Sequence, residues 1–106
     1  MSSNSRGSET ERKCIAELEA DGWRIMFRSV RMRWQSVDFD NTFDVVAVKD
    51  HVWRLVQCKT GRPSTVKEMD KLDRWRIANT PDSPRMSIEL WIWRKGNRWD
   101  KYVSRE

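Results

Sequence analysis

The stretch FDVVAVKDHVWRLVQCK, residues 43–59, decides the fold. It consists of two apolar runs rich in β-branched residues, with the polar pair Asp50-His51 between them. This pattern predicts two antiparallel strands, over residues 43–48 and 52–59, joined by a tight turn. A symmetric turn sets the register of the hairpin, with these facing pairs: Lys49 with Val52, Val46 with Leu55, and Asp44 with Gln57.

The register also sorts the polar side chains of the hairpin. Successive residues of a strand point to opposite faces of the sheet, so Gln57 and Lys59 share one face. Asp44 joins that face through its pairing with Gln57, whereas Val56 and Cys58 point the other way, into packing. A carboxylate, an amide and an amine are therefore expected to converge on a hairpin that is otherwise apolar.

The flanking segments predict the rest of the architecture. We expect helices over residues 8–20 and 66–78, the first capped by Ser8 and the second opened by a Thr65-x-x-Glu68 capping box. Residues 29–42 show no clear period and are expected to form a loop. Three further strands are predicted over residues 23–27, 86–94 and 98–103. The order α-β-β-β-α-β-β predicts an α/β fold, in which helices flank one central sheet.

Length and composition limit the classes of protein that fit. The chain has 106 residues, enough for one domain over residues 8–106 with a Ser-rich, disordered tail over residues 1–7. A net charge of +5 favours an anionic partner. One His and 2 Cys argue against a Cys/His zinc site and against a disulfide framework. No apolar run approaches the roughly 18–20 residues of a membrane span, and no signal-peptide pattern is present, so a cytoplasmic protein is expected.

Glu11 is the unusual residue of the first predicted helix. It lies one turn before Ile15, on the face that carries Cys14 and Leu18. A carboxylate that faces inward is costly unless something pairs with it. Glu11 also stands three residues after Ser8, where a capping box would place it, so both interpretations remain open.

These residues fit the chemistry of phosphodiester hydrolysis. That reaction uses a divalent cation to neutralise developing charge and to activate water, and Mg²⁺ takes oxygen ligands. Asp44 and the Gln57 carbonyl oxygen can supply such ligands, and Glu11 can add a carboxylate. Lys59 can orient the attacking water or stabilise the charged transition state.

The candidate residues occur in a fixed order along the predicted elements: Glu11 in the first helix, Asp44 in the first strand of the hairpin, and Gln57-Cys58-Lys59 in the second. This arrangement resembles the PD-(D/E)xK nuclease superfamily, most of all the small archaeal and viral Holliday-junction resolvases. The resemblance runs from about residue 8 to residue 80. It implies a restriction-endonuclease-like core, Mg²⁺ or Mn²⁺ as cofactor, and a homodimer that cleaves branched or four-way-junction DNA.

The resemblance also implies roles for single residues. Asp44 would be the central metal ligand, Glu11 and Gln57 further ligands, and Lys59 the catalytic lysine. Gln57 stands where the family usually has Asp or Glu, and Phe43 where it usually has Pro. An amide still offers an oxygen, but it removes one negative charge and weakens the attraction for Mg²⁺.

Alternative ligands and DNA contacts stay open. Asp38 and Asp40 would be the ligands if the strand boundary were shifted. Ser29 and Ser36 are candidate counterparts of a serine that the family carries in its first loop. The expected nucleic-acid-binding residues are Arg28, Arg31, Arg33, Trp34, Arg62, Lys67 and Lys71. For Lys67 and Lys71, an ordinary solvated helix face is an equally good interpretation.

Three hypotheses about function follow. The first is a metal-dependent DNA endonuclease. The second is a catalytically inactive DNA-binding module on the same fold, with Gln57 as the mark of lost activity. The third is an interaction protein that uses its Trp-rich C-terminal strands. In those strands Trp91 and Trp93 alternate with apolar residues, which predicts cover on both faces, by helices or by a dimer partner.

Overall fold

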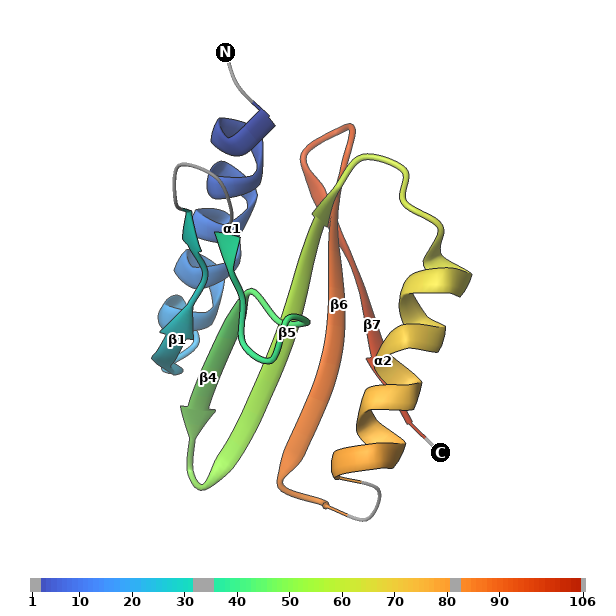
Figure 1. Ribbon diagram of the computed structural model, residues 1–106. Coiled ribbons are helices and arrows are strands. Elements are labelled where there is room, and N and C mark those ends of the chain that lie inside the picture. Colours follow the sequence, from blue (N-terminus) through green and yellow to red (C-terminus); the bar gives the residue numbers. More distant parts are fainter. Residues whose placement is uncertain (1–2, 32–35, 81–82, 106) are drawn as a thin grey trace.

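A computed structural model describes residues 3–31, 36–80 and 83–105 of the chain. Its main sheet has five strands in the order β1-β4-β5-β6-β7, with helix α1 on one face and helix α2 on the other (Figure 1). The elements are α1 (Ser3–Ala20), β1 (Arg24–Arg28), β4 (Val45–Lys49), β5 (Val52–Thr60), α2 (Thr65–Asn79), β6 (Met86–Arg94) and β7 (Arg98–Ser104). β5 and β6 are parallel and the other neighbours antiparallel, so the predicted α/β class with one mixed sheet is confirmed.

The predicted hairpin forms with the predicted register. Val46 faces Leu55 and Lys49 faces Val52. Both turn residues, Asp50 and His51, have positive φ values of 50° and 66°, as a two-residue hairpin turn requires. The ladder of pairs ends at Val45 with Val56, so the expected pair of Asp44 with Gln57 falls just beyond the paired part of β4.

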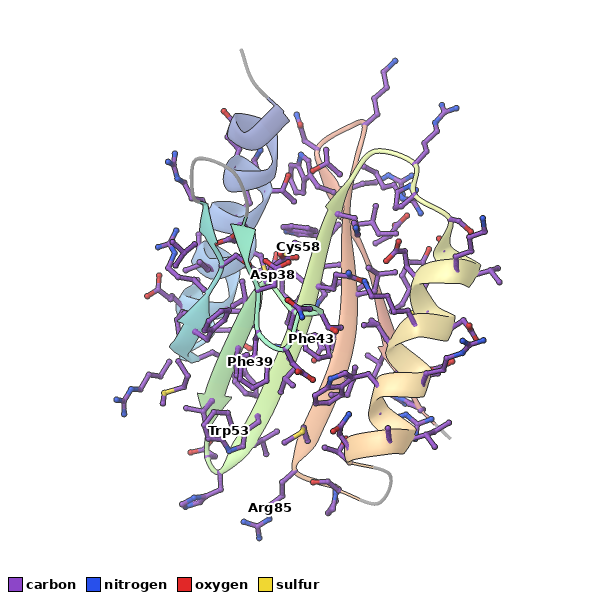
Figure 2. The ribbon with its side chains drawn as sticks, viewed as in Figure 1. Asp38, Phe39, Phe43, Trp53, Cys58 and Arg85 are labelled. Carbon is purple, nitrogen blue, oxygen red and sulfur yellow. The ribbon has the colours of Figure 1, made fainter. Side chains whose placement is uncertain are left out.

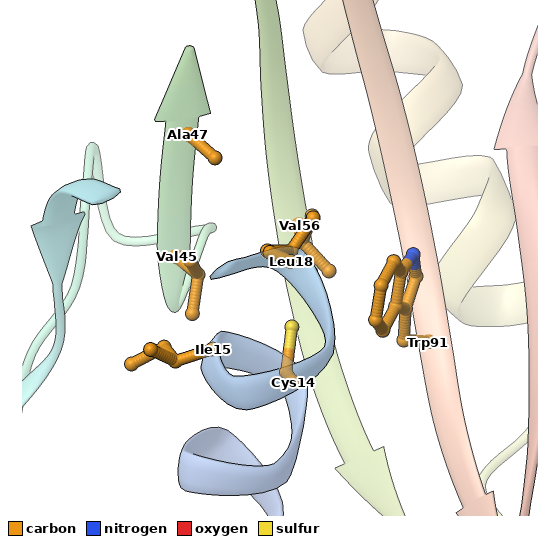
Figure 3. Close-up of a cluster of buried hydrophobic side chains, with 7 residues drawn as sticks. All are labelled: Cys14, Ile15, Leu18, Val45, Ala47, Val56 and Trp91. Atoms are coloured by element: carbon orange, nitrogen blue, oxygen red, sulfur yellow. The ribbon is translucent and has the colours of Figure 1, made fainter. Parts of the chain in front are cut away.

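The strand alternation divides the core into two clusters. On the α1 face, Val45 and Val56 pack against Cys14 and Leu18 of α1 (Figure 3). On the α2 face, Val46 and Leu55 pack in the cluster that contains Leu72 of α2. Cys58 packs against the α1 cluster, which confirms that Val56 and Cys58 point away from the face of Leu55.

Strand β6 is covered on both faces, as its sequence predicts. Ile88, Leu90 and Ile92 belong to the α2 cluster, whereas Trp91 belongs to the α1 cluster and is only 1% exposed. A strand between two helical layers has no solvent-facing side, and this explains its nearly continuous apolar sequence. Within the described residues, helices of this chain supply that cover as far as Ile92, whereas Trp93 near the end of the strand is only partly buried.

Both helix starts differ from the prediction. α1 begins at Ser3, so Ser8 lies inside the helix and is not its cap. The capping-box interpretation of Glu11 is therefore wrong. α2 is capped by Ser64, whose side chain accepts a hydrogen bond from the Lys67 backbone N–H, rather than by Thr65.

The segment predicted as a loop contains two short strands, β2 (Val30–Arg31) and β3 (Ser36–Val37), which pair with each other. The main sheet is thus accompanied by a small ribbon over residues that showed no period. In the described part of the chain, no helix is both long and apolar enough to cross a membrane.

Candidate functional site

Asp44 is held at the point where β4 begins while β5 runs on. Its backbone N–H donates to the Val56 carbonyl oxygen at 2.9 Å, as in a strand ladder. Its side chain then takes the place of the next ladder acceptor, because Oδ2 accepts a hydrogen bond from the Cys58 backbone N–H at 2.7 Å. Asp44 is 9% exposed, and its carboxylate lies along the edge of β5, in line with the backbone hydrogen bonds of the sheet.

Ser29 brings a second carboxylate to the same place. Its Oγ lies 3.1 Å from Asp44 Oδ1 and 2.6 Å from Asp38 Oδ1. A hydroxyl has one proton to donate, so it can satisfy only one of these two oxygens at a time. Two carboxylates therefore share one donor, and this gathers negative charge beside Cys58. Figure 2 labels Asp38 and Cys58 in this region.

Of the two alternative ligands, only Asp38 is brought to Asp44. Asp40 lies in the following turn, where its Oδ2 accepts a hydrogen bond from Trp75 Nε1 of α2 at 2.8 Å. Ser29 is buried and linked to Asp44 by a second contact, from its backbone N–H to the Asp44 carbonyl oxygen at 2.8 Å.

Glu11 reaches this region from α1. It is buried, and its Oε1 lies 3.8 Å from Arg28 Nε of β1. The pKa of the neighbouring Cys58 thiol lies well above its ordinary value. The causes are first its hydrogen bond with Cys14, then burial and the negative charges around it, those of Asp44 and Glu11 among them. Glu11 and Asp44 therefore act on the same residue, and the inward position predicted for Glu11 is confirmed.

Gln57 and Lys59 belong to the α2 side. Gln57 is 4% exposed, and its Oε1 has no hydrogen-bond partner among the described residues. A buried amide oxygen without a partner is rare and destabilising. Lys59 Nζ lies 4.0 Å from Glu68 Oε1, which is an ion pair but too long for a hydrogen bond.

Glu68 was predicted only as a capping residue, with no functional role. Its side chain is 22% exposed, and its Oε2 is a buried atom with no hydrogen-bond partner in the described part of the chain. The spacing to Leu72 was the available signal, because a residue one turn before a core leucine shares its inward face.

The donor set fits a divalent cation only if the Gln57 amide takes part. Within the described ranges, no three His, Cys, Asp or Glu side chains come together as a metal site. Asp44 is fixed at the end of β4, and Gln57 offers an oxygen that nothing described satisfies. Carboxylate and amide oxygens are ligands that Mg²⁺ accepts.

The predicted DNA-binding residues are spread around this region. Arg28 lies beside Glu11, and Arg62 is exposed just after the end of β5. Lys67 and Lys71 are exposed on α2. The remaining predicted contacts, namely the side chain of Arg31 and the whole of Arg33 and Trp34, lie outside the described residues, as does the side chain of Ser36, the second candidate for the loop serine.

Comparison with known proteins adds no family to this description. A scan against protein-family models finds none that matches the chain. A search of curated proteins likewise finds no significant match.

Proposed function

We propose that this protein is a divalent-metal-dependent endonuclease that hydrolyses phosphodiester bonds in branched DNA, such as a Holliday junction. The observation that carries the proposal is the buried Gln57 Oε1, which has no partner among the described residues and stands two positions before Lys59. Asp44, fixed by the Cys58 backbone, adds a carboxylate at the adjoining strand end. This set matches the order of polar groups in the nucleases that the sequence resembles.

In the proposed site, Asp44 at the edge of β5 would hold Mg²⁺ or Mn²⁺ together with Gln57 from the α2 side, and Glu11 would be a further ligand from the α1 side of the same edge. When bound, the cation neutralises charge on the phosphate and activates water. Ser29 and the Cys58 N–H orient the Asp44 carboxylate, so it does not have to reorganise during the reaction. Lys59 stabilises the negative charge that develops on the scissile phosphate, or orients the water that attacks it.

The expected partner is DNA, and the positive charge of the chain supports it. Arg28, Arg62, Lys67 and Lys71 are exposed and would contact phosphates on either side of the site. The net charge of +5 would make this binding salt-dependent. A homodimer would present two such sites to the two strands that a resolvase cuts.

The proposal is tested by incubating the purified protein with labelled four-way-junction, flap and duplex DNA, in Mg²⁺ and in Mn²⁺. Asp44→Asn and Lys59→Met are expected to lower the cleavage rate at least about 100-fold, because the first removes the charge of the central metal ligand and the second removes the cation that acts on the phosphate or the water. DNA binding in EDTA should persist in both variants. Asp70→Asn, on the exposed side of α2 where Asp70 pairs with Arg74, is the matched control and should cut like the parent.

The outcomes separate the hypotheses. Cleavage at the parental rate by Asp44→Asn would show that the site is assigned wrongly. DNA binding with no cleavage in either metal would favour the inactive DNA-binding module. Absence of any DNA affinity that weakens with salt would favour an interaction protein.

A further inference from the structure

A cluster of tryptophans leads from the core to the surface at the hairpin of β6 and β7. Trp91 is buried under α1, and its ring meets Trp99 at a centroid distance of 5.3 Å. Trp99 in turn meets Trp93, its cross-strand partner, at 5.0 Å with the ring planes 69° apart. Trp93 and Trp99 are only partly buried, so the outer end of the cluster is open to solvent.

The opening exists because α1 covers only part of its sheet face. The helix contacts β1, β4 and β5, and its Cys14 and Leu18 reach Trp91. Beyond them a hollow of about 650 Å³ remains between α1 and the β6–β7 hairpin. Its lining includes Lys13 and Ala16 of α1 and Trp93, Arg98 and Trp99 of the hairpin.

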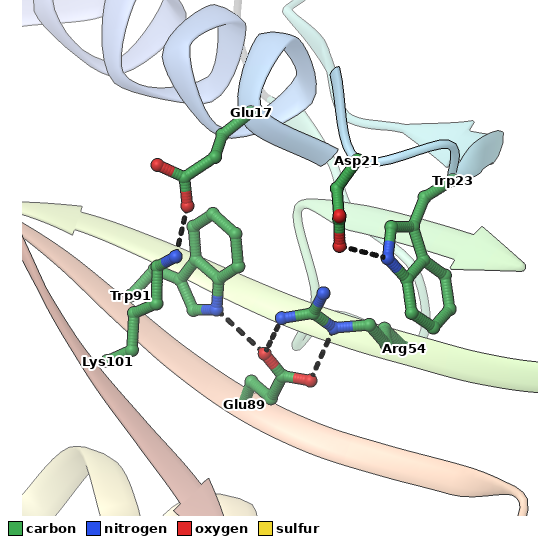
Figure 4. A network of polar contacts seen from close by, with 7 residues as sticks. All are labelled: Glu17, Asp21, Trp23, Arg54, Glu89, Trp91 and Lys101. Carbon is green, nitrogen blue, oxygen red and sulfur yellow. Dashed lines mark hydrogen bonds and ion pairs between the residues drawn. The ribbon is translucent and has the colours of Figure 1, made fainter. Parts of the chain in front are cut away.

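Positive charge surrounds this hollow. Lys13 Nζ lies 4.9 Å from the centre of the Trp93 ring, a cation–π distance. Lys101 lies 4.0 Å from the Trp91 ring and forms an ion pair with Glu17 (Figure 4). The cations that line the hollow are Lys13, Arg98 and Lys101, and the only anion in its described lining is Glu17. The surplus of positive charge suits a phosphate backbone.

The hollow is connected to the candidate site by the pairing of β5 with β6. Trp93 is the register partner of Thr60, which directly follows Lys59. The Thr60 hydroxyl contacts the hydroxyl of Thr10, which directly precedes Glu11. A strand of nucleic acid that passes around the end of β5, from Lys59 on the α2 side to the exposed Thr60 on the α1 side, would meet the Trp93 ring next.

We propose that Trp93, Trp99 and Lys13 form a stacking platform for unpaired bases, and that the substrate is DNA with a single-stranded segment beside the cleavage point. Aromatic rings surrounded by cations bind single strands by stacking bases and attracting phosphates. In a duplex the bases stack on one another, so their faces are not available to the tryptophan rings. The platform would therefore bind a duplex more weakly than a single strand. The role of the segment in cleavage rests on the proposed nuclease function, but the binding itself does not.

The test measures the affinity of labelled oligodeoxythymidine and of a duplex of equal length by fluorescence anisotropy, in EDTA so that no metal-dependent cleavage can occur. The parent should prefer the single strand and show quenched tryptophan fluorescence. Trp99→Leu should weaken single-strand binding about 5- to 100-fold, the loss expected for one stacked base. Lys13→Gln should weaken it less, and Trp23→Leu, a half-buried tryptophan that follows the C-terminal end of α1 and does not line the hollow, should not.

Thermal unfolding controls for damage to the fold. Lys13 is exposed on α1, so Lys13→Gln should keep the parental melting temperature even if Trp99→Leu does not. Equal affinity for single strand and duplex, or parental affinity in both variants, would overturn the platform. Tighter binding of RNA than of DNA of the same sequence would overturn the assignment to DNA.

The two proposals fail in different ways. A protein that binds single strands through Trp99 but cuts nothing in Mg²⁺ or Mn²⁺ has the platform without the nuclease. A protein that cuts four-way junctions equally well as the parent and as Trp99→Leu, without single-strand preference, has the nuclease without the platform.

Discussion

At residue 57 the chain carries a neutral amide in a buried place. A carboxylate in that place would be costly without a cation, because a buried charge loses its hydration. With a cation bound, the same carboxylate would be the better ligand, because it adds a negative charge. The identity of this residue therefore couples the stability of the fold to the presence of metal.

Gln57→Glu is expected to make stability depend on metal. In EDTA the variant should lose about 3 kcal/mol of unfolding free energy, the scale of an uncompensated buried charge. Saturating Mg²⁺ should then raise its melting temperature by more than it raises that of the parent. Bound ligand at about 100 times its dissociation constant stabilises by about 2.7 kcal/mol. Thermal unfolding with and without Mg²⁺ measures both effects.

Asn97→Asp, in the exposed turn between β6 and β7, adds the same charge where no metal ion is proposed. It should show no extra response to Mg²⁺. A Gln57→Glu variant that responds to Mg²⁺ no more than this control would argue against a cation at residue 57.

The sequence predicted the strand residues of the candidate site better than the contacts around them. Gln57 and Lys59 follow from strand alternation, and Glu11 from helical periodicity, because both signals are local. The sharing of the Ser29 hydroxyl by Asp38 and Asp44 was not predicted. It depends on a segment without periodicity that folds back over the sheet.

At the scale of strands, β5 and β6 are joined by an ion pair that the sequence did not predict. Arg54 donates two hydrogen bonds of 2.7 Å to the two carboxylate oxygens of Glu89, which is only 3% exposed (Figure 4). Trp91 Nε1 donates a further bond of 2.8 Å. Burial raises the pKa of Glu89, but the hydrogen bonds from Arg54, Ser87 and Trp91 outweigh it, so the pKa lies below its ordinary value.

Glu89→Gln is expected to destabilise the fold at neutral pH and to change its response to acid. The substitution leaves the partly exposed Arg54 without its charged partner, and losing these charged hydrogen bonds costs about 1.5–3 kcal/mol. In the parent, the lowered pKa means that the unfolded chain binds the proton more readily than the folded one. The stabilisation by Glu89 is therefore complete above its ordinary pKa of 4.5 and is lost as the pH falls below that value.

Urea unfolding at pH 7 and at pH values on both sides of 4.5 tests this prediction. The parent should lose more stability over the acid range than Glu89→Gln, which has no carboxyl group to titrate at this position. Glu19→Gln, on the exposed side of α1, is the control and should behave like the parent. Equal acid losses in the parent and in Glu89→Gln would mean that Glu89 does not stabilise the fold through its charge.

The order of the elements was predictable, whereas their ends were less so. The hairpin register follows from a turn of fixed length, and β6 follows from its apolar run. The start of α1 at Ser3 was missed, because residues 3–7 contain Ser, Asn and Gly, which have low helix propensity. The ribbon of β2 and β3 was missed because its residues show no alternation.

For the molecule as a whole, two helices do not cover both faces of a five-stranded sheet. α2 contacts β6 and β7, and the other half of its sheet face carries a hollow of about 740 Å³. Met26, Phe39 and Trp53 line that hollow and are 45%, 39% and 36% exposed. Exposed apolar surface of this kind favours association with another chain. We expect a second copy to cover it, as the proposed homodimer requires.

Sedimentation equilibrium should therefore give a mass about twice the 12.8 kDa of the chain. The double variant Met26→Lys/Trp53→Lys should sediment as a monomer at the same concentration. Burying ammonium groups in an apolar interface is costly, and a loss of more than 2 kcal/mol weakens association at least about 30-fold. Since both side chains are exposed in the single chain, the variant should keep most of the parental melting temperature.

Val66→Lys/Ile77→Lys provides the matched control, because these residues are 80% and 61% exposed on α2 and do not line the hollow. It adds the same two charges and should remain a dimer. A double-lysine variant of the hollow that still dimerises would place the interface elsewhere, and a parent that stays monomeric at high concentration would contradict the homodimer. Either result leaves the single-chain site around Asp44 open to the cleavage test, because that site uses residues of one chain.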